Sequence, residues 1–331
     1  MGKFAITAVA LVTIAAVVHG QDPVPQLPGA QHPERSLFRS SASMVALNVT
    51  VTDGRKLVTG LDASDFEVSE DGVAQQLRFF EATRVPMDVI LLLDASSSMR
   101  DRMPVVHDAA KGFMRLLRQG DRGAVVSFAN NVRVVQDLTS DASAIESGIN
   151  STVASGATAL NNAVYIALKQ FGQSARTTGD VRRQAIAVLS DGEDTSSLIS
   201  FDDVVGLART MGVSIYTIGL QSAVQAIRSN APSPQFSEAA YRLNALARET
   251  GARAFFPSTV HELKDVYATI SDELKAQYSL AYSPTNSRAD GRFRRVAVRV
   301  TTNPSLRSRT RTGYTADPVS ANLAISPPVL R

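Results

Sequence analysis

One uninterrupted apolar run, followed at once by a carboxylate and hydroxyls, constrains the fold more than any other stretch of this sequence. The run is Val89–Leu93, and it shows no alternation between apolar and polar residues. A strand that is covered on both faces has this pattern, because neither side of it meets water. Asp94, Ser96 and Ser98 follow the run at a spacing of two residues. We therefore expect a buried strand of a parallel sheet, with a cluster of oxygen atoms at its carboxyl end.

Strand and helix patterns alternate between residues 85 and 276, which is typical of a doubly wound α/β fold with helices on both faces of a mostly parallel sheet. Six segments read as its strands: 89–93, 124–128, 132–135, 185–189, 213–218 and 252–256. In the common order 3-2-1-4-5-6 the first and fourth strands are neighbours, and ligands gather beyond their carboxyl ends. Asp94 and Asp191 come just after these two strands. The topology therefore predicts that both carboxylates lie at the same edge of the sheet.

The segments on either side of this α/β unit have the period-2 pattern of half-buried strands. The alternating or strand-like stretches are 45–51, 65–72, 76–80, 278–282 and 293–300. Each flank alone is too small to be independently stable. We expect residues 43–84 and 277–316 to pair into one small β-sandwich, with the domain at 85–276 inserted between them. Two separate flaps packed on the inserted domain would also fit the pattern.

The two ends of the chain predict no packed structure. Residues 1–20 combine Lys3 with an uncharged apolar stretch at 4–18, as a secretory signal peptide does, although an uncleaved membrane anchor has a similar pattern. Residues 21–42 and 317–331 show no periodicity, and we expect them to be flexible. No segment after residue 20 is apolar enough to cross a bilayer. We therefore expect an exported protein, periplasmic or extracellular, without a transmembrane segment once the signal is removed.

Two later segments add the residue types that a metal site would need. Thr158, in the stretch Gly156-Ala157-Thr158, contributes a hydroxyl, and Asp191 contributes a second carboxylate. Hard oxygen ligands of this kind suit a small divalent cation, Mg²⁺ or Mn²⁺, with Ca²⁺ less favoured. Two carboxylates neutralise such an ion without filling the six positions that it prefers. Water or an acidic side chain of another protein can take the open position.

Together, these segments make residues of about 86–275 resemble a von Willebrand factor type A domain. The five ligand positions of that family's metal-ion-dependent adhesion site hold the expected residue types: Asp94, Ser96, Ser98, Thr158 and Asp191. The resemblance implies that the first four contact Mg²⁺ directly or through water, that Asp191 acts through water, and that a protein partner donates a carboxylate. It therefore implies metal-dependent, adhesion-type protein binding.

The flanks resemble exported bacterial "VWFA-related" proteins that are frequent in acidobacteria, through 49–53, 61–68, 70–72, 282–284 and 311–314. One residue departs from the pattern of the adhesion site: Ala157 stands where the family usually has a second glycine. The conformation of this loop depends on whether that position needs a positive φ, which a Cβ disfavours. The contact of Thr158 with the metal depends on the same condition.

Other functions fit the sequence less well. A dehalogenase-type phosphatase needs a second Asp two residues after the first, and here that residue is Ser96; a serine hydrolase elbow needs glycines that are absent, and there is no Cys. We therefore expect no enzymatic activity. The net charge of +3 is small, and six arginines between residues 294 and 311 read as a solvated strand face, so we expect no nucleic-acid partner. A structural role in envelope assembly, with a metal that only stabilises the fold, is the alternative function; the oligomeric state stays open.

Overall fold

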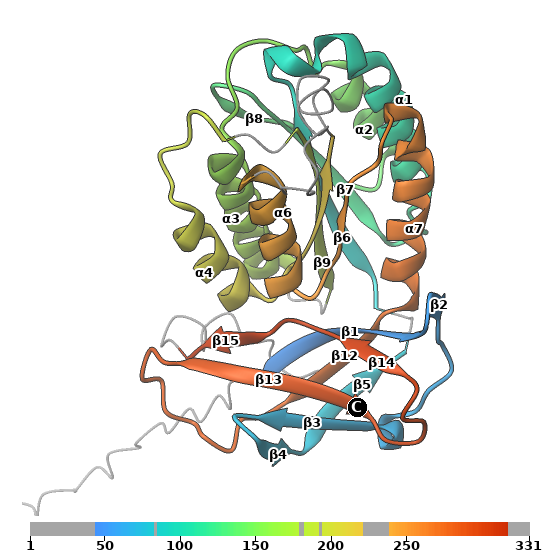
Figure 1. The fold of residues 1–331 in the computed structure, drawn as a ribbon, viewed down its shortest axis with the longest axis vertical. Helices are drawn as coiled ribbons and strands as arrows, with labels where there is room; N and C mark the ends of the chain where they lie inside the picture. The colour runs from blue at the N-terminus through green and yellow to red at the C-terminus, as the bar shows by residue number, and fades with distance from the viewer. Residues whose placement is uncertain (1–43, 83–84, 179–181, 192–193, 221–237, 317–331) are drawn as a thin grey trace, which may run out of the picture. The chain divides into compact units, whose positions relative to one another are not determined.

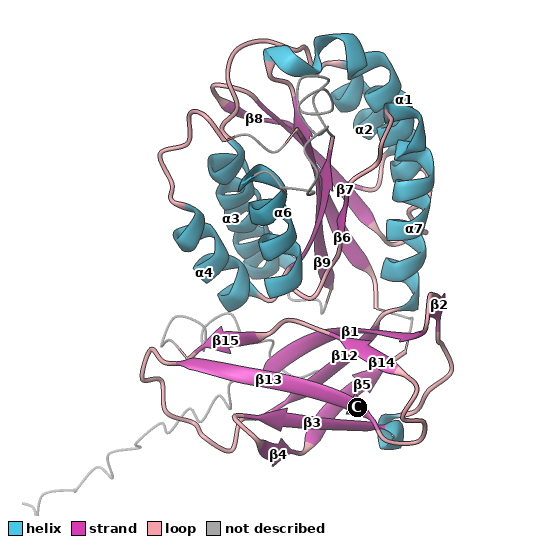
Figure 2. Cartoon of the chain, viewed as in Figure 1, coloured by secondary structure: helices cyan, strands magenta, loops and turns pink. Residues whose placement is uncertain are grey.

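The computed structural model describes residues 44–82, 85–178, 182–191, 194–220 and 238–316. These residues all belong to one compact unit, which spans 41–331. Figure 1 shows the path of the chain through an α/β part and a β part, and Figure 2 shows their helices and strands. The predicted signal peptide at 1–20, the N-terminal segment at 21–42 and the tail at 317–331 lie outside the described residues.

A six-stranded sheet forms the centre of the α/β part, in the order β11-β10-β9-β6-β7-β8 (Figure 1). Its strands are β6 (Met87–Asp94), β7 (Arg122–Phe128), β8 (Val132–Thr139), β9 (Arg183–Ser190), β10 (Ser214–Gly219) and β11 (Ala254–Phe255). All neighbouring strands run parallel except β7 and β8. This is the doubly wound order that the sequence predicted, with the first and fourth strands, β6 and β9, side by side.

Strand β6 is buried along its whole length and belongs to two hydrophobic cores. Val89, Leu91 and Leu93 pack on the side that α1 and α7 cover, whereas Ile90 and Leu92 pack on the side of α3, α4 and α6 (Figure 2). The split follows from the alternation of side chains along a strand. Full burial of each such side chain stabilises the fold by about 1.5–3 kcal/mol. The apolar run therefore contributes side chains to both cores. The predicted fold class, a doubly wound α/β fold, is confirmed.

Helices cover both faces of this sheet. They are α1 (Met103–Met114), α2 (Ala142–Asn150), α3 (Leu160–Thr178), α4 (Phe201–Met211), α6 (Glu238–Glu249) and α7 (Leu263–Ala276). Side-chain caps explain two of the starts: Asp141 accepts from the backbone N–H of Ser143 at 2.8 Å, and Ser200 accepts from that of Asp203 at 3.1 Å. Among the described residues, no helix combines the length and the apolar character that a bilayer span requires.

Strands from both flanks interleave in the β part, where they form two antiparallel sheets. One has the order β14-β1-β12-β5, with β2 also paired to β1, and the other has the order β15-β13-β3-β4. Their bounds are β1 (Val45–Asp53), β2 (Lys56–Leu57), β3 (Phe66–Glu70), β4 (Val73–Gln75), β5 (Leu77–Glu81), β12 (Tyr278–Tyr282), β13 (Phe293–Val300), β14 (Arg307–Arg309) and β15 (Gly313–Thr315). Side chains of both sheets share one apolar core. The flanks therefore form the expected sandwich, and not two separate flaps.

The α/β part is inserted between two strands that pair with each other. Strand β5 leads into it and β12 follows directly from α7, and these two strands are antiparallel neighbours, with Ser279 opposite Glu81. The chain therefore leaves and re-enters the sandwich at adjacent positions, about 5 Å apart in the hydrogen-bonding direction.

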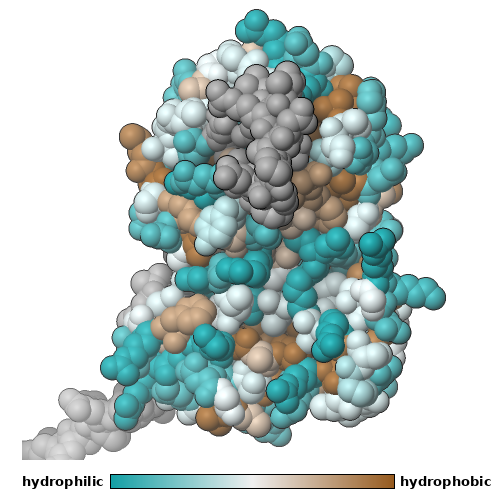
Figure 3. All heavy atoms as spheres, viewed as in Figure 1, coloured by the Kyte–Doolittle hydropathy of each residue, from teal (hydrophilic) through white to brown (hydrophobic). Residues whose placement is uncertain are grey.

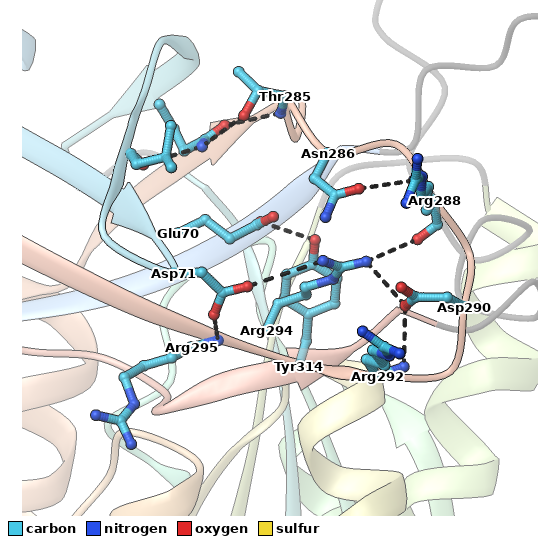
Figure 4. A network of polar contacts seen from close by, with 12 residues as sticks. Glu70, Asp71, Thr285, Asn286, Arg288, Asp290, Arg292, Arg294, Arg295 and Tyr314 are labelled. Atoms are coloured by element: carbon cyan, nitrogen blue, oxygen red, sulfur yellow. Dashed lines mark hydrogen bonds and ion pairs between the residues drawn. The ribbon is translucent and has the colours of Figure 1, made fainter.

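The sequence indicated that the C-terminal arginines form a solvated strand face, and for Arg294 this prediction is wrong. Its side chain is only 7% exposed, because it lies on the buried face of β13, whereas the next residue, Arg295, lies on the opposite face and is exposed. One terminal nitrogen donates to Asp290 Oδ1 at 2.9 Å and to the backbone carbonyl of Arg288 at 3.2 Å; the other lies 3.9 Å from Asp71 (Figure 4). The sandwich thus holds this charge within a network of its own acidic and carbonyl oxygens.

The sandwich and the α/β part meet closely at Gly251. This residue has a φ of +76°, and a Cβ there would lie 2.4 Å from the carbonyl carbon of Thr310. Arg309 Nε donates to the backbone carbonyl of Gly251 at 3.0 Å. Only glycine fits here, because a side chain would meet both an unfavourable backbone conformation and the backbone of the facing segment.

We expect Gly251→Ala to destabilise the chain more than Gly60→Ala does. Gly60 also has a positive φ, +86°, but a Cβ there would meet open space. Gly60→Ala should therefore lower the free energy of unfolding by about 1–2 kcal/mol, and Gly251→Ala by clearly more, because of the added backbone overlap. Urea unfolding followed by circular dichroism measures both. Equal losses would contradict the close approach at Gly251.

Candidate metal centre

Four of the five residues expected to bind a metal come together beyond the carboxyl ends of β6 and β9. Asp94 is the last residue of β6, and Asp191 follows directly after β9. The Ser98 hydroxyl donates to Asp191 Oδ2 at 2.6 Å, and the hydroxyls of Ser96 and Ser98 lie 2.9 Å apart. The parallel pairing of β6 with β9 thus brings the two loops into contact, at the edge of the sheet where the topology placed them.

Asp94 is fully buried and held in place by hydrogen bonds to both of its carboxylate oxygens. Oδ1 accepts from the backbone N–H of Ser96 at 2.8 Å, and Oδ2 accepts from the Ser190 hydroxyl at 2.6 Å. Burial raises the pKa of Asp94 to about 6, despite these hydrogen bonds, and the negative charge of Asp191 adds to the rise. The carboxylate therefore lacks the positive counter-charge that its ionised form needs.

Thr158 reaches the same region from a different loop. It is buried, and its backbone is bonded to Thr195: its N–H donates to Thr195 Oγ1 at 3.1 Å, and its carbonyl accepts from Thr195 N at 2.9 Å. Ser97 N donates to the Gly156 carbonyl at 3.0 Å, which ties this loop to the turn after β6. Within the described parts of the chain, no hydrogen bond links the Thr158 hydroxyl to the other four candidate ligands.

The alanine that departs from the family pattern is accommodated, because the preceding residue is the one that needs to be glycine. Gly156 has a φ of +77°, and a Cβ there would lie 2.8 Å from the side chain of Asn130. Among the described residues, Asp71 is the single non-glycine with a positive φ, so Ala157 has an ordinary backbone conformation. Its N–H donates to Asn130 Oδ1.

Sequence reasoning missed three residues that support the cluster. Ser190 bonds Asp94, Asn130 anchors the Ala157 backbone, and Thr195 anchors the Thr158 backbone. A hydroxyl at the last position of a strand, next to a candidate ligand, was a signal that could have found Ser190. Nothing in the local pattern marks the other two. Asp194, three residues after Asp191, accepts from Asn161 N at 3.1 Å near the start of α3.

The chemistry of this cluster suits a hard cation. The side-chain atoms that this cluster offers to a metal are all oxygens, and Asp191 Oδ1 is buried without a hydrogen-bond partner in the part of the chain that the structure describes. Across the described residues, neither Asp94 nor Asp191 forms an ion pair with Lys, Arg or His. No group of three or more His, Cys, Asp or Glu side chains gathers anywhere in those residues, so a metal here would rely on hydroxyls beside the two carboxylates. Such mixed oxygen sets are typical ligands of Mg²⁺ and Mn²⁺.

Comparison with known proteins agrees with the geometry. A family model for the von Willebrand factor type A domain matches residues 88–269. An uncharacterized protein of Borreliella burgdorferi is 23% identical over 208 residues, which cover 58% of this chain and 56% of the relative. A UPF0353 protein of Mycolicibacterium paratuberculosis is 26% identical over 212 residues, which cover 58% and 62%. This chain therefore spans less than two thirds of the length of either relative.

A solved structure, a von Willebrand factor type A protein from Catenulispora acidiphila, is also similar. It is 14% identical, with a TM-score of 0.48, and the match covers 85% of this chain and 65% of the other.

We expect Asp94→Asn to stabilise the metal-free protein at neutral pH. The pKa of Asp94 is higher in the folded than in the unfolded chain, so the folded state binds more protons between about pH 4 and about pH 6. The stability from this group is therefore present below about pH 4 and lost as the pH rises to about 6. The neutral amide does not titrate, and above pH 6 the variant should gain about 2–3 kcal/mol relative to wild type.

Urea unfolding in the presence of a chelator, at pH 4 and at pH 8, measures this difference. The control is Asp101→Asn, because Asp101 is an exposed carboxylate in the same turn. A difference between wild type and Asp94→Asn that does not change with pH would show that Asp94 is not the strained group.

Proposed function

The chain belongs to the von Willebrand factor type A domain family, and from this membership we propose that the oxygen cluster at the end of β6 holds a divalent cation that binds a protein partner. Domains of this family commonly mediate protein interactions in a metal-dependent way. The observation that carries the proposal is the buried carboxylate of Asp94, which has no cationic partner among the described residues and lies beside a second carboxylate.

Each residue has a distinct role in the proposed site. Asp94 anchors the ion, Ser96 and Ser98 add hydroxyl ligands from the same turn, and Thr158 adds one from the loop that is tied to this turn. Asp191, which already accepts from the Ser98 hydroxyl, acts through water. Mg²⁺ and Mn²⁺ are the preferred ions, because they are small, hard cations with nearly octahedral coordination.

The partner is expected to supply an acidic side chain. A dication with two protein carboxylates is neutral but not saturated, so a third carboxylate can complete its coordination. We propose binding, and not catalysis, because metal-dependent protein interaction is what domains of this family commonly do. Export to the periplasm or the cell surface is part of the proposal, and the pattern of residues 1–20 supports it.

A scaffolding role in the cell envelope is the second candidate. Asp94 is buried, and no described residue forms an ion pair with it, so a bound cation would itself stabilise the fold. In that case the metal would serve the structure alone, and no partner would depend on it.

Titration with Mg²⁺ or Mn²⁺ tests the metal site directly. Isothermal calorimetry of the wild-type chain should give a saturable heat with one site. Asp94→Asn should weaken metal binding by more than about 100-fold, because it removes the charge of a direct ligand. Mutation of a residue that only supports a ligand already lowers metal affinity by about 10- to 100-fold. Asp101→Asn should bind as wild type does. The absence of any saturable heat from the wild-type chain would overturn the metal site.

Thr158→Val separates adhesion from scaffolding. The substitution keeps the side-chain volume and the backbone bonds to Thr195, and removes only the hydroxyl. If the metal serves adhesion, capture of a partner from native envelope should depend on Mg²⁺, vanish with chelator and weaken in the variant, while the melting temperature without metal stays unchanged. If it serves the scaffold, the variant should lose metal-induced stabilisation and no chelator-sensitive partner should be captured.

A further inference from the structure

A second candidate site lies away from the metal centre. A cavity of about 560 Å³ is lined by α6 and the segment after it on one side, and by β13, β14 and the residues that follow β14 on the other. On the face drawn in Figure 3, hydrophilic side chains gather at the level between the α6 and β13 ribbons of Figure 1. Its described lining residues include four arginines and no carboxylate: Arg248, Arg253, Arg309 and Arg311.

Two of these arginines share one buried acid outside the cavity lining. Glu273 of α7, whose side chain is 2% exposed, pairs with Arg253 at 2.8 Å and also with Arg309. One carboxylate thus serves two guanidinium groups, which leaves an excess of positive charge. Arg248 is 69% exposed and lies 3.6 Å from Glu249, a carboxylate already bonded at 2.8 Å to Arg209. Among the residues that the structure describes, the acids around the cavity are therefore fewer than the arginines.

Arg311 is the residue that most needs a counter-charge. It is 7% exposed, and within the described residues it pairs with no carboxylate. One terminal nitrogen donates to the backbone carbonyl of Arg209 at 2.9 Å, near the C-terminus of α4, and the guanidinium lies 5.5 Å from the centre of the Tyr314 ring. A helix C-terminus and an aromatic face each offer partial negative charge only. Burial accordingly lowers the pKa of Arg311 below its usual value.

Two buried polar atoms of cavity-lining residues also lack hydrogen-bond partners within the described segments. They are Nε of Arg311 and Oγ1 of Thr310. A buried donor without an acceptor is costly, and a buried charge more so, so native proteins normally satisfy such groups. Both atoms can donate to the oxygens of an anion, and guanidinium groups recognise carboxylate and phosphate oxygens well.

We propose that this cavity binds a small oxyanionic ligand, bearing carboxylate or phosphate groups, whose oxygens accept from Arg311 and Thr310. The volume lies within the range of small-molecule sites. The excess of arginines supplies the attraction, and Arg248 at the exposed rim supplies further positive charge. The proposal is independent of the metal at the end of β6.

Calorimetric titration of the full chain with inorganic phosphate and, separately, with citrate tests the proposal. The protein is first treated with chelator and then dialysed into metal-free buffer without chelator, so that neither a metal nor the carboxylates of the chelator contribute. The ionic strength is held constant with chloride. Saturable binding of either anion is expected, and the tighter of the two identifies the class of the ligand. If neither anion gives saturable binding, the proposal is wrong.

One variant and one matched control locate the site. Arg248→Gln should weaken binding by about threefold, since it removes an exposed charge at the rim. Arg242→Gln removes the same charge from the same helix, where Arg242 pairs with Glu238 outside the cavity lining, and should leave binding unchanged. If both variants weaken anion binding equally, the anion is attracted by the general charge of the protein and does not bind at this cavity.

Thr310→Val distinguishes a ligand-binding role from a structural one. The hydroxyl has no hydrogen-bond partner among the described residues, so its removal at nearly constant volume should not lower the free energy of unfolding. Anion binding should weaken by about five- to tenfold, because one hydrogen bond to the ligand is lost. Unchanged affinity in this variant would overturn the proposed contact.

Discussion

The parallel pairing of β6 with β9 is the interaction on which the rest of the structure depends. The ladder joins residues 87–93 to 183–189, and the apolar side chains of both strands pack into a core on each face of the sheet. A shift of register by one residue would exchange the two faces of each strand. Because both cores are closely filled, the register is fixed, and with it the relative position of Asp94 and Asp191.

The candidate metal centre therefore lies at the end of a fully buried strand, while its own charge is unfavourable. Asp94 is buried beside a second acid, and the hydrogen bonds from Ser96 and Ser190 offset only part of the cost. A fold that tolerates this arrangement draws its stability from elsewhere, chiefly from the two cores. Strain of this kind is common at functional sites.

The sequence was sufficient for features that depend on local pattern and on general rules of topology. The apolar run and the alternation of elements predicted the strand order, and the order predicted that the loops after β6 and β9 meet. The sequence was insufficient to predict whether a side chain is buried where that burial depends on segments far away in the chain. Strand alternation shows which residues share a face with Arg294, but not that the face is covered at that end. Short strands such as β2 and β14 are defined by their partners, and carry too few residues for a pattern of their own.

The same limit applies to the arginine-lined cavity. Arg248 and Arg311 are far apart along the chain and come from different parts of the fold, so no spacing could have linked them. Whether a basic residue is solvated or enclosed is a property of the packed structure, since an arginine can bury its apolar stem in either case.

The insertion of the α/β part between β5 and β12 has a consequence for the order of folding. In the unfolded chain these two strands are separated by the whole inserted segment, and bringing them together costs loop-closure entropy. Once the inserted segment has collapsed on its own cores, its two ends are already neighbours and the cost has been met. The sandwich should therefore assemble late, on a template that the inserted domain provides, and a nascent chain could complete it only after residues beyond α7 have been synthesised.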